Sequence, residues 1–177
     1  MRDEEIALAG YQTAFGWVGM AVSGQGLCHL TLPQESQAQA ATELRREFPA
    51  GQWGATGALE GLGDRLRRYF AGDEVDFADI LLDLSRGTDF QRAVWSACRS
   101  IPRGQVRTYR WLAQEAGSPR ASRAAGQAMA HNPIPIIIPC HRVVGSNGSL
   151  TGFGGGLEMK RRLLELERAI VPGGPIQ

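Results

Sequence analysis

The sequence changes abruptly from apolar to reactive at residues 134–142, which read IPIIIPCHR. The aliphatic run predicts a buried strand at 134–138, ended by a proline that cannot donate to a ladder of backbone hydrogen bonds. Cys140, His141 and Arg142 follow at once, so the fold must bring a thiol, an imidazole and a guanidinium to the edge of a core. This pattern is typical either of a small core cysteine, the commoner case, or of a nucleophile held away from water.

The overall composition is that of a globular protein. The 177 residues are 43% apolar and 21% charged, which suits one domain or two small ones. The acidic start predicts no signal peptide, and no apolar run reaches the ~20 residues of a membrane span. The three cysteines lie at scattered spacings that suit a reducing compartment. We therefore expect a cytoplasmic protein without a membrane partner, associated with the nucleoid if bacterial.

Charge is distributed unevenly along the chain. Residues 1–85 carry 6 Lys/Arg against 13 Asp/Glu, whereas residues 86–131 carry 8 Arg against 2 acidic residues. A compact basic segment beside an acidic half indicates that one part meets a polyanion. An ordinary solvated helical face rich in arginine would give the same count, so charge alone leaves both interpretations open.

The first half predicts a mixed α/β domain spanning residues 1–86. Its expected elements are two strands within 15–32 joined by a Gly-containing turn at 23–26, helices at 34–48 and 62–72, and a strand at 78–84. A turn-prone stretch at 85–88 follows. We place the domain boundary there because it coincides with the change of charge.

The second half predicts a mostly helical domain, residues 87–170, followed by a C-terminal tail at 171–177. Helices are expected at 89–101, 109–117, 120–131 and 157–169, with the strand 134–138 between the last two. Residues that can cap the first three are Thr88 or Asp89, Thr108, and Ser118 followed by proline. The second and third helices flank a short Gly-containing turn, as in a helix-turn-helix.

The helix at 120–131 is an unusual candidate for reading a DNA sequence. Helices that read bases in the major groove normally offer Asn, Gln, Arg or Lys. This helix offers alanines and a glycine, with Arg123 as its single long cation. Small residues allow a close approach to a narrow groove that is read for its shape. Alternatively, the alanines are good helix formers packed inside the protein.

Cys140 needs a nearby base or cation before its thiol can act as a nucleophile. Neighbours in an extended segment point to opposite sides, so we expect His141 to act through a water or around a turn. Cys28, Cys98 and His131 are further ligand types, but no C-x-x-C or H-x-x-x-H spacing occurs. We predict neither a metal site nor another cofactor.

Glu167 falls on the apolar arc of the last predicted helix, four residues after Leu163 and three after Leu164. A carboxylate that faces a core must be paired or hydrogen-bonded. A structural bond to Arg142 would satisfy it, and so would orientation of His141 as the third member of a relay. The pattern leaves both possibilities open.

Four stretches together resemble the O6-alkylguanine-DNA alkyltransferase family, the methylated-DNA–protein-cysteine methyltransferases. They read FQRAVWSACRSIPRGQVRTYRWLA, RAAGQAMAHNPIP, IIIPCHRVV and GSLTGFGGGLEMKRRLLELE, and they span about half the chain. Such a long ordered set is far more specific than P-C-H-R alone. The resemblance implies an α/β (α+β) fold. It would place an N-terminal mixed α/β domain with an antiparallel, ribonuclease H-like sheet before a mostly helical, winged helix-turn-helix-like domain that carries the active site.

The resemblance also implies a cofactor-free DNA repair reaction that each molecule performs once. Cys140 would take the alkyl group from O6 of a guanine flipped out of the duplex. His141 would act as its base through a water, and Glu167 would orient the imidazole. Tyr109 would donate to the flipped base, and Asn132 would brace the turn before the active-site strand.

The partner implied by the resemblance is double-stranded DNA containing O6-alkylguanine, bound in the minor groove with little sequence preference. Arg123 would fill the gap left by the flipped nucleotide. The other residues implied to contact DNA are Thr108, Arg110, Ala121, Ala124, Gly126 and Ala130, and those implied to line the guanine pocket are Met129, Val143, Phe153 and Gly154. We expect a monomer, and cooperative binding along DNA is left open.

Two pocket positions depart from the family pattern. Phe153 stands where the family often has tyrosine, and Gly154 where some members have serine. We expect methyl transfer to survive both changes, with tolerance of bulkier alkyl groups left open.

Three rival classes are a lesion binder without transfer, a helix-turn-helix regulator and a cysteine hydrolase. Cys140 argues against a lesion binder, because such proteins lack the cysteine. The alanine-rich helix argues against a regulator that reads a DNA sequence. The lack of an oxyanion loop or a distant histidine argues against a hydrolase.

Overall fold

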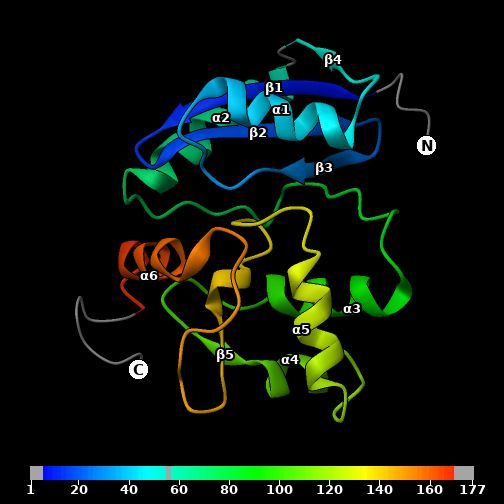
Figure 1. Ribbon diagram of the computed structural model, residues 1–177, viewed down its shortest axis with the longest axis vertical. Coiled ribbons are helices and arrows are strands. Elements are labelled where there is room, and N and C mark those ends of the chain that lie inside the picture. The colour runs from blue at the N-terminus through cyan, green and yellow to red at the C-terminus, as the bar shows by residue number, and fades with distance from the viewer. Residues whose placement is uncertain (1–5, 55–56, 170–177) are drawn as a thin grey trace. The chain divides into compact units, whose positions relative to one another are not determined.

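The computed structural model describes residues 6–54 and 57–169 (Figure 1). The chain divides into two compact units, Met1–Leu84 and Ser85–Gln177. No helix within the described ranges is long and apolar enough to cross a membrane. The predicted tail at 171–177 lies outside the described residues.

The first unit is built on a four-stranded sheet in the order β3-β2-β1-β4. The strands are β1 (Ala7–Thr13), β2 (Gly16–Ser23), β3 (Gly26–Leu30) and β4 (Gln52–Trp53). The first three form an antiparallel meander, and β4 pairs parallel with β1. The hairpin predicted around residues 23–26 is confirmed. Strand β1 was not predicted, because its alanines and glycine have little β propensity.

Two helices, α1 (Gln37–Glu47) and α2 (Gly57–Phe70), cover opposite faces of this sheet (Figure 1). Both approach so closely that glycine is required at the contact. A Cβ at Gly19 would lie 2.8 Å from Leu44 of α1, and one at Gly63 of α2 would lie 2.6 Å from the ring of Tyr11. The absence of a side chain at these positions brings helix and strand together.

The strand predicted at 78–84 is wrong, because this stretch forms a single bridge between Leu82 and Leu27 of β3. The Leu27 amide donates to Leu81, and Asp83 donates back to Leu27. The carboxylate of Asp83 then accepts a 2.6 Å hydrogen bond from the Ser23 hydroxyl. The segment is therefore held at the sheet edge by one bridge and a side chain.

The second unit contains four of the predicted helices. In chain order its elements are α3 (Asp89–Arg99), β5 (Arg107–Thr108), α4 (Tyr109–Glu115), α5 (Ser122–Ala130), the 3-10 turn η2 (Cys140–Arg142), β6 (Val143–Val144) and α6 (Gly156–Leu166). Thr88 caps α3 in a capping box with Gln91. Thr108 caps α4 by accepting from the Trp111 amide. Both predicted caps are confirmed. The helices of this unit and the sheet of the first unit agree with the predicted α/β class.

The N-terminus of α5 differs from the prediction that Ser118 caps it. The helix begins after Ala121, and no side chain caps it. Ser118 instead donates its amide to Ala113 as α4 closes over Gly117, whose φ is +79°. This amide and the left-handed glycine complete a helix C-terminus, so the chain makes one more turn before α5 starts.

The strand predicted at 134–138 is also wrong, since the apolar run folds into a tight turn. Ile136 adopts a left-handed φ of 73°, and the Ile138 amide donates to Ile134. The Asn132 side chain donates to the Ile138 carbonyl at 2.8 Å and accepts from the Ile134 amide at 3.0 Å. Prolines at 133 and 135 lack donors, so this side chain replaces the strand partner that the run would otherwise need.

Helix α5 is anchored by Trp95 of α3, whose buried indole donates to the Ala128 carbonyl at 2.8 Å. We expect Trp95→Phe to lower the free energy of unfolding by about 2 kcal/mol, because the Ala128 carbonyl loses one of its two donors and the core loses volume. Urea denaturation checks this, with Trp53→Phe on the exposed strand β4 as the control. Equal effects of the two substitutions would contradict the anchoring role.

Candidate active site

The reactive segment and the start of α4 lie side by side because two short strands pair. In the parallel pairing of β5 with β6, Arg107 lies opposite Val143 and Thr108 opposite Val144. The strand residues come directly before Tyr109 and directly after η2. The pairing therefore brings the Tyr109 ring and the Cys140 thiol into one site.

A buried charge cluster fixes the far side of η2. His141 and the Glu167 side chain have no solvent exposure, and Nε2 of His141 lies 2.9 Å from Oε1 of Glu167. Arg142 donates to both oxygens of the same carboxylate, each at 2.8 Å. Glu167 thus contacts both of the partners that the sequence offered for it, His141 and Arg142.

The protonation state of Glu167 follows from these partners. Burial alone would raise the pKa of this carboxyl, but His141 and Arg142 hold it well below its usual range. A carboxylate at Oε1 favours the tautomer in which Nε2 of His141 carries the proton. The lone pair of the neutral ring then lies at Nδ1, where it can accept a proton.

Cys140 opens the 3-10 turn, and part of the residue reaches solvent. Burial of the thiol raises its pKa, while a hydrogen bond from the Asn132 side chain and the charge of Lys160 oppose this rise. Asn132 therefore supports both the tight turn and the sulfur atom. Because a thiolate is the reactive form, these two contacts favour the chemistry that burial opposes.

Lys160 is a site residue that the sequence reasoning missed. It has no solvent exposure, and its Nζ donates to the Thr151 carbonyl at 2.7 Å. The Tyr109 hydroxyl donates to the same carbonyl at 3.3 Å. The signal was present, because Lys160 precedes Leu163 by three residues and so lies on the apolar arc that carries Glu167.

The residues predicted to line the pocket differ in exposure. Val143 and Met129 are buried, Phe153 is half-buried and Gly154 is exposed. Burial raises the pKa of Tyr109, which keeps its hydroxyl protonated as a donor near neutral pH. The site thus combines a thiol, an imidazole and a phenol beside a partly apolar wall.

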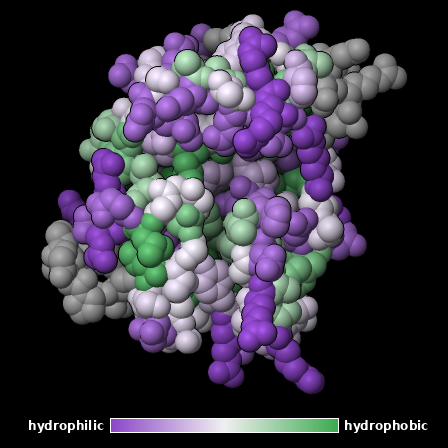
Figure 2. All heavy atoms as spheres, in the orientation of Figure 1, coloured by the Kyte–Doolittle hydropathy of each residue, from purple (hydrophilic) through white to green (hydrophobic). Residues whose placement is uncertain are grey.

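The residues predicted to contact DNA lie on or near the exposed side of the helix-turn-helix. Exposed among them are Arg110, Arg123, Ala124 and Ala130, and half-buried are Thr108, Ala121 and Gly126. Figure 2 shows hydrophilic side chains gathered where α4 and α5 lie. Other alanines of α5, Ala125 and Ala128, are buried. Helix α5 therefore carries small residues both on its buried face and on its exposed face.

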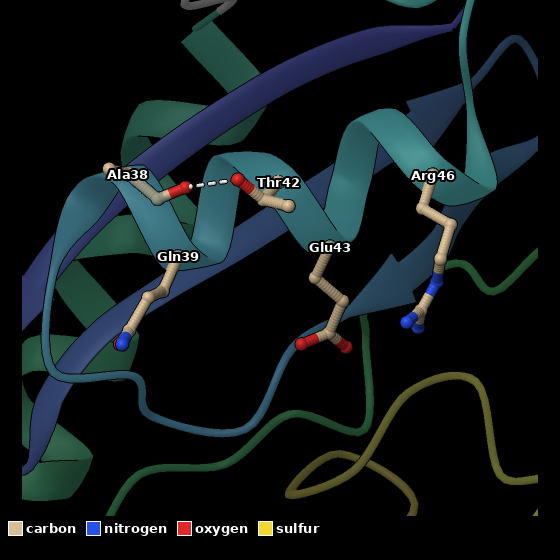
Figure 3. A pocket seen from close by; sticks show the side chains of 5 residues that line it. All are labelled: Ala38, Gln39, Thr42, Glu43 and Arg46. Atoms are coloured by element: carbon tan, nitrogen blue, oxygen red, sulfur yellow. Dashed lines mark hydrogen bonds between the residues drawn. The ribbon is translucent and has the colours of Figure 1, made fainter.

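Other chemistry in the described residues is limited. Within 6–54 and 57–169, no group of three or more His, Cys, Asp or Glu residues is arranged to hold a metal ion. A polar hollow on α1 is lined by Ala38, Gln39, Thr42, Glu43 and Arg46 (Figure 3). The Thr42 hydroxyl donates to the Ala38 carbonyl at 2.8 Å. This bond ties the hydroxyl to its own helix, and the thiol at Cys140 remains the better candidate nucleophile.

Comparison with known proteins finds relatives for this chain. A family described as "6-O-methylguanine DNA methyltransferase, DNA binding domain" matches residues 89–169. A methylated-DNA–protein-cysteine methyltransferase of Mycobacterium tuberculosis is 54% identical over 116 residues, which are 66% of this chain and 69% of that relative.

Solved structures extend the similarity to both units. The O6-methylguanine methyltransferase of M. tuberculosis has a TM-score of 0.75 and 41% identity, covering 96% of each chain. A structure of the M. tuberculosis protein in complex with DNA has a TM-score of 0.74 and 43% identity, and the match covers 92% of each chain. The fold and the site define a DNA-binding protein with a half-buried cysteine at its candidate active site. The chain belongs to the O6-methylguanine-DNA methyltransferase family.

The buried cluster makes stability depend on Glu167. We expect Glu167→Gln to lower the free energy of unfolding at pH 7 by about 3 kcal/mol, because Arg142 loses its buried counter-charge. Since the folded-state pKa is depressed, wild-type stability should fall as pH drops below the ordinary value of 4.5. The variant should lack that part of the decline. Urea denaturation between pH 3 and 7, with Glu165→Gln as control, checks this; overlapping curves for Glu167→Gln and wild type would contradict it.

Proposed function

We propose that this protein repairs duplex DNA by transferring the alkyl group of O6-alkylguanine to its own Cys140. The observation that carries the proposal is the convergence of the half-buried Cys140, Asn132 and Tyr109 with the buried His141–Glu167 pair. The family supports the reaction class. The relatives' names describe methylated DNA as the donor and a protein cysteine as the acceptor.

The chemistry assigns a task to each group. His141 removes the thiol proton through a water, with Glu167 orienting the ring and stabilising its charge. The Cys140 thiolate attacks the alkyl carbon, and the bond from that carbon to O6 breaks. Tyr109 gives its hydroxyl proton to the departing guanine, which leaves as a neutral base, and the proton taken up by His141 returns to the phenolate through water. The thioether is not hydrolysed by any group of the site, so each molecule acts once.

Flipping of the nucleotide is a physical requirement of this reaction. The alkyl carbon on O6 cannot be reached in line while the guanine is stacked in the duplex. Extrusion costs a few kcal/mol, and a side chain that fills the gap offsets part of this. We assign that role to Arg123, which is exposed on α5 beside small residues. Helix α5 then lies in the minor groove, and Met129, Val143, Phe153 and Gly154 surround the flipped base.

We further propose that the protein acts as a monomer in the cytoplasm and reads DNA with little sequence preference. The exposed part of α5 presents alanines rather than base-reading side chains, which supports recognition by groove shape. Arginine contacts to phosphates should make binding strongly dependent on salt. Cooperative binding along DNA would add contacts between copies, and titration of longer duplexes measures it.

The transfer itself can be tested with a duplex that carries O6-methylguanine. We expect one CH2 unit of added mass per protein molecule, located at Cys140 by peptide mass spectrometry, and no second turnover. Cys140→Ala should retain lesion binding and lose repair completely, whereas Cys28→Ala should transfer normally. Tight binding without transfer by the wild type would contradict the proposal and favour a lesion-binding protein.

The role of Arg123 can be separated from general charge attraction. We expect Arg123→Ala to slow transfer from duplex DNA at least about tenfold, because nothing fills the gap left by the flipped base. Transfer from a single strand should change much less, since no flipping is needed there. Arg120→Ala removes a nearby exposed arginine and serves as the control. Equal losses on both substrates would contradict the role of Arg123 in extrusion.

A further inference from the structure

Lys160 is the single lysine of the chain. The other 18 of the 19 Lys/Arg residues are arginine. Arginine stays charged at every pH that a protein survives, whereas the charge of a lysine can be tuned by its surroundings. This one lysine lies on α6 without solvent exposure. The chain thus places its only titratable long cation inside the site.

The contacts of Lys160 link two segments of the candidate site. Its Nζ donates to the Thr151 carbonyl, which also accepts from the Tyr109 hydroxyl. Thr151 lies two residues before Phe153, in the loop that forms the pocket wall. One carbonyl therefore holds the loop, the phenol and the ammonium group together.

We propose that Lys160 is a positioning residue of the transfer site, whose ammonium group anchors the Thr151 carbonyl and stabilises the negative charge of the Cys140 thiolate. The inference rests on the proposed function, because it takes Cys140 as the nucleophile. It assigns to Lys160 no contact with the alkyl group. Its influence reaches the reaction through the sulfur atom and the loop.

The electrostatics of the site support this assignment. The groups that act on Cys140 are Asn132, Lys160 and the backbone of η2, while the thiol of Cys98 on α3 and the phenol of Tyr109 on α4 lie within the same field. Lys160 is thus the cation that lowers the pKa of the Cys140 thiol against the effect of burial.

The sign of the pH dependence follows from the lysine. Burial lowers the pKa of Lys160 to about 8, while the charge of an ionised Cys140 raises it. At neutral pH the ammonium form prevails and supports the thiolate. As pH rises through about 8, this support is lost, and the thiol ionises without help only at higher pH, because burial raises its pKa. The contribution of Lys160 is therefore largest near neutral pH.

The first test measures thiol ionisation without DNA. The rate of Cys140 alkylation by iodoacetamide is followed against pH, with the modified residue identified by mass spectrometry. We expect Lys160→Met to react roughly tenfold more slowly than wild type at pH 7 and equally fast at high pH. Arg162→Met, a cation removed from the exposed face of α6, should leave the profile unchanged. A wild-type profile in Lys160→Met would overturn the proposal.

The second test uses the lysine itself and needs no Lys160 variant. Protein labelled with 13C-lysine gives one lysine side-chain signal, because the chain holds one lysine. Its titration midpoint should lie well below the ordinary value of 10.5 and should fall further in Cys140→Ser, where the thiolate is absent. A midpoint that Cys140→Ser leaves unchanged would overturn the link between the two residues, even if Lys160→Met did not fold.

Transfer kinetics complete the test and separate it from the proposed function. With O6-methylguanine duplex, Lys160→Met should lower the single-turnover rate at saturating DNA about tenfold at pH 7 while DNA affinity stays the same. An unchanged rate there would count against the proposal. If the wild type transferred no methyl group at all, the proposed function would fail, whereas the thiol and lysine titrations would still report on Lys160.

Discussion

The rest of the second unit depends on the buried carboxylate of Glu167. Its charge cannot remain uncompensated away from water, so His141 and Arg142 must both reach it. Arg142 also donates to the Ile101 carbonyl just beyond α3, and Arg103 donates to Leu166 at the end of α6. One buried charge thereby fixes η2 against two helices and sets the orientation of the imidazole.

The sequence predicted the helices of this unit well and its extended segments poorly, for a physical reason. Helices are local, so the caps at Thr88 and Thr108 and the spacing of apolar residues are enough to locate them. Strands need partners from elsewhere in the chain. The run 134–138 is apolar enough for a strand, but the Asn132 side chain supplies its hydrogen bonds, and Ile136 takes a left-handed conformation.

The site residues that could be predicted were likewise those with a local signal in the sequence. Cys140 and His141 stood out by their chemistry, and Glu167 stood out because a carboxylate on an apolar arc requires a partner. Lys160 lies on the same arc, but lysine commonly extends its charged end to solvent, so its position alone predicts little. The decisive fact was tertiary, since the Thr151 carbonyl comes from a loop whose path the sequence does not reveal.

The location of Cys140 creates a conflict that its surroundings must resolve. A water-poor pocket strengthens hydrogen bonds to a departing guanine, yet the same burial raises the pKa of the Cys140 thiol and disfavours the thiolate. The carboxylate of Glu167 cannot help the sulfur directly, because its negative charge is already directed at His141 and Arg142. A cation on the sulfur side is needed, and it must tolerate burial before the thiolate forms. Burial lowers the pKa of Lys160 to about 8, so the ammonium form still prevails near neutral pH, where the thiolate most needs support.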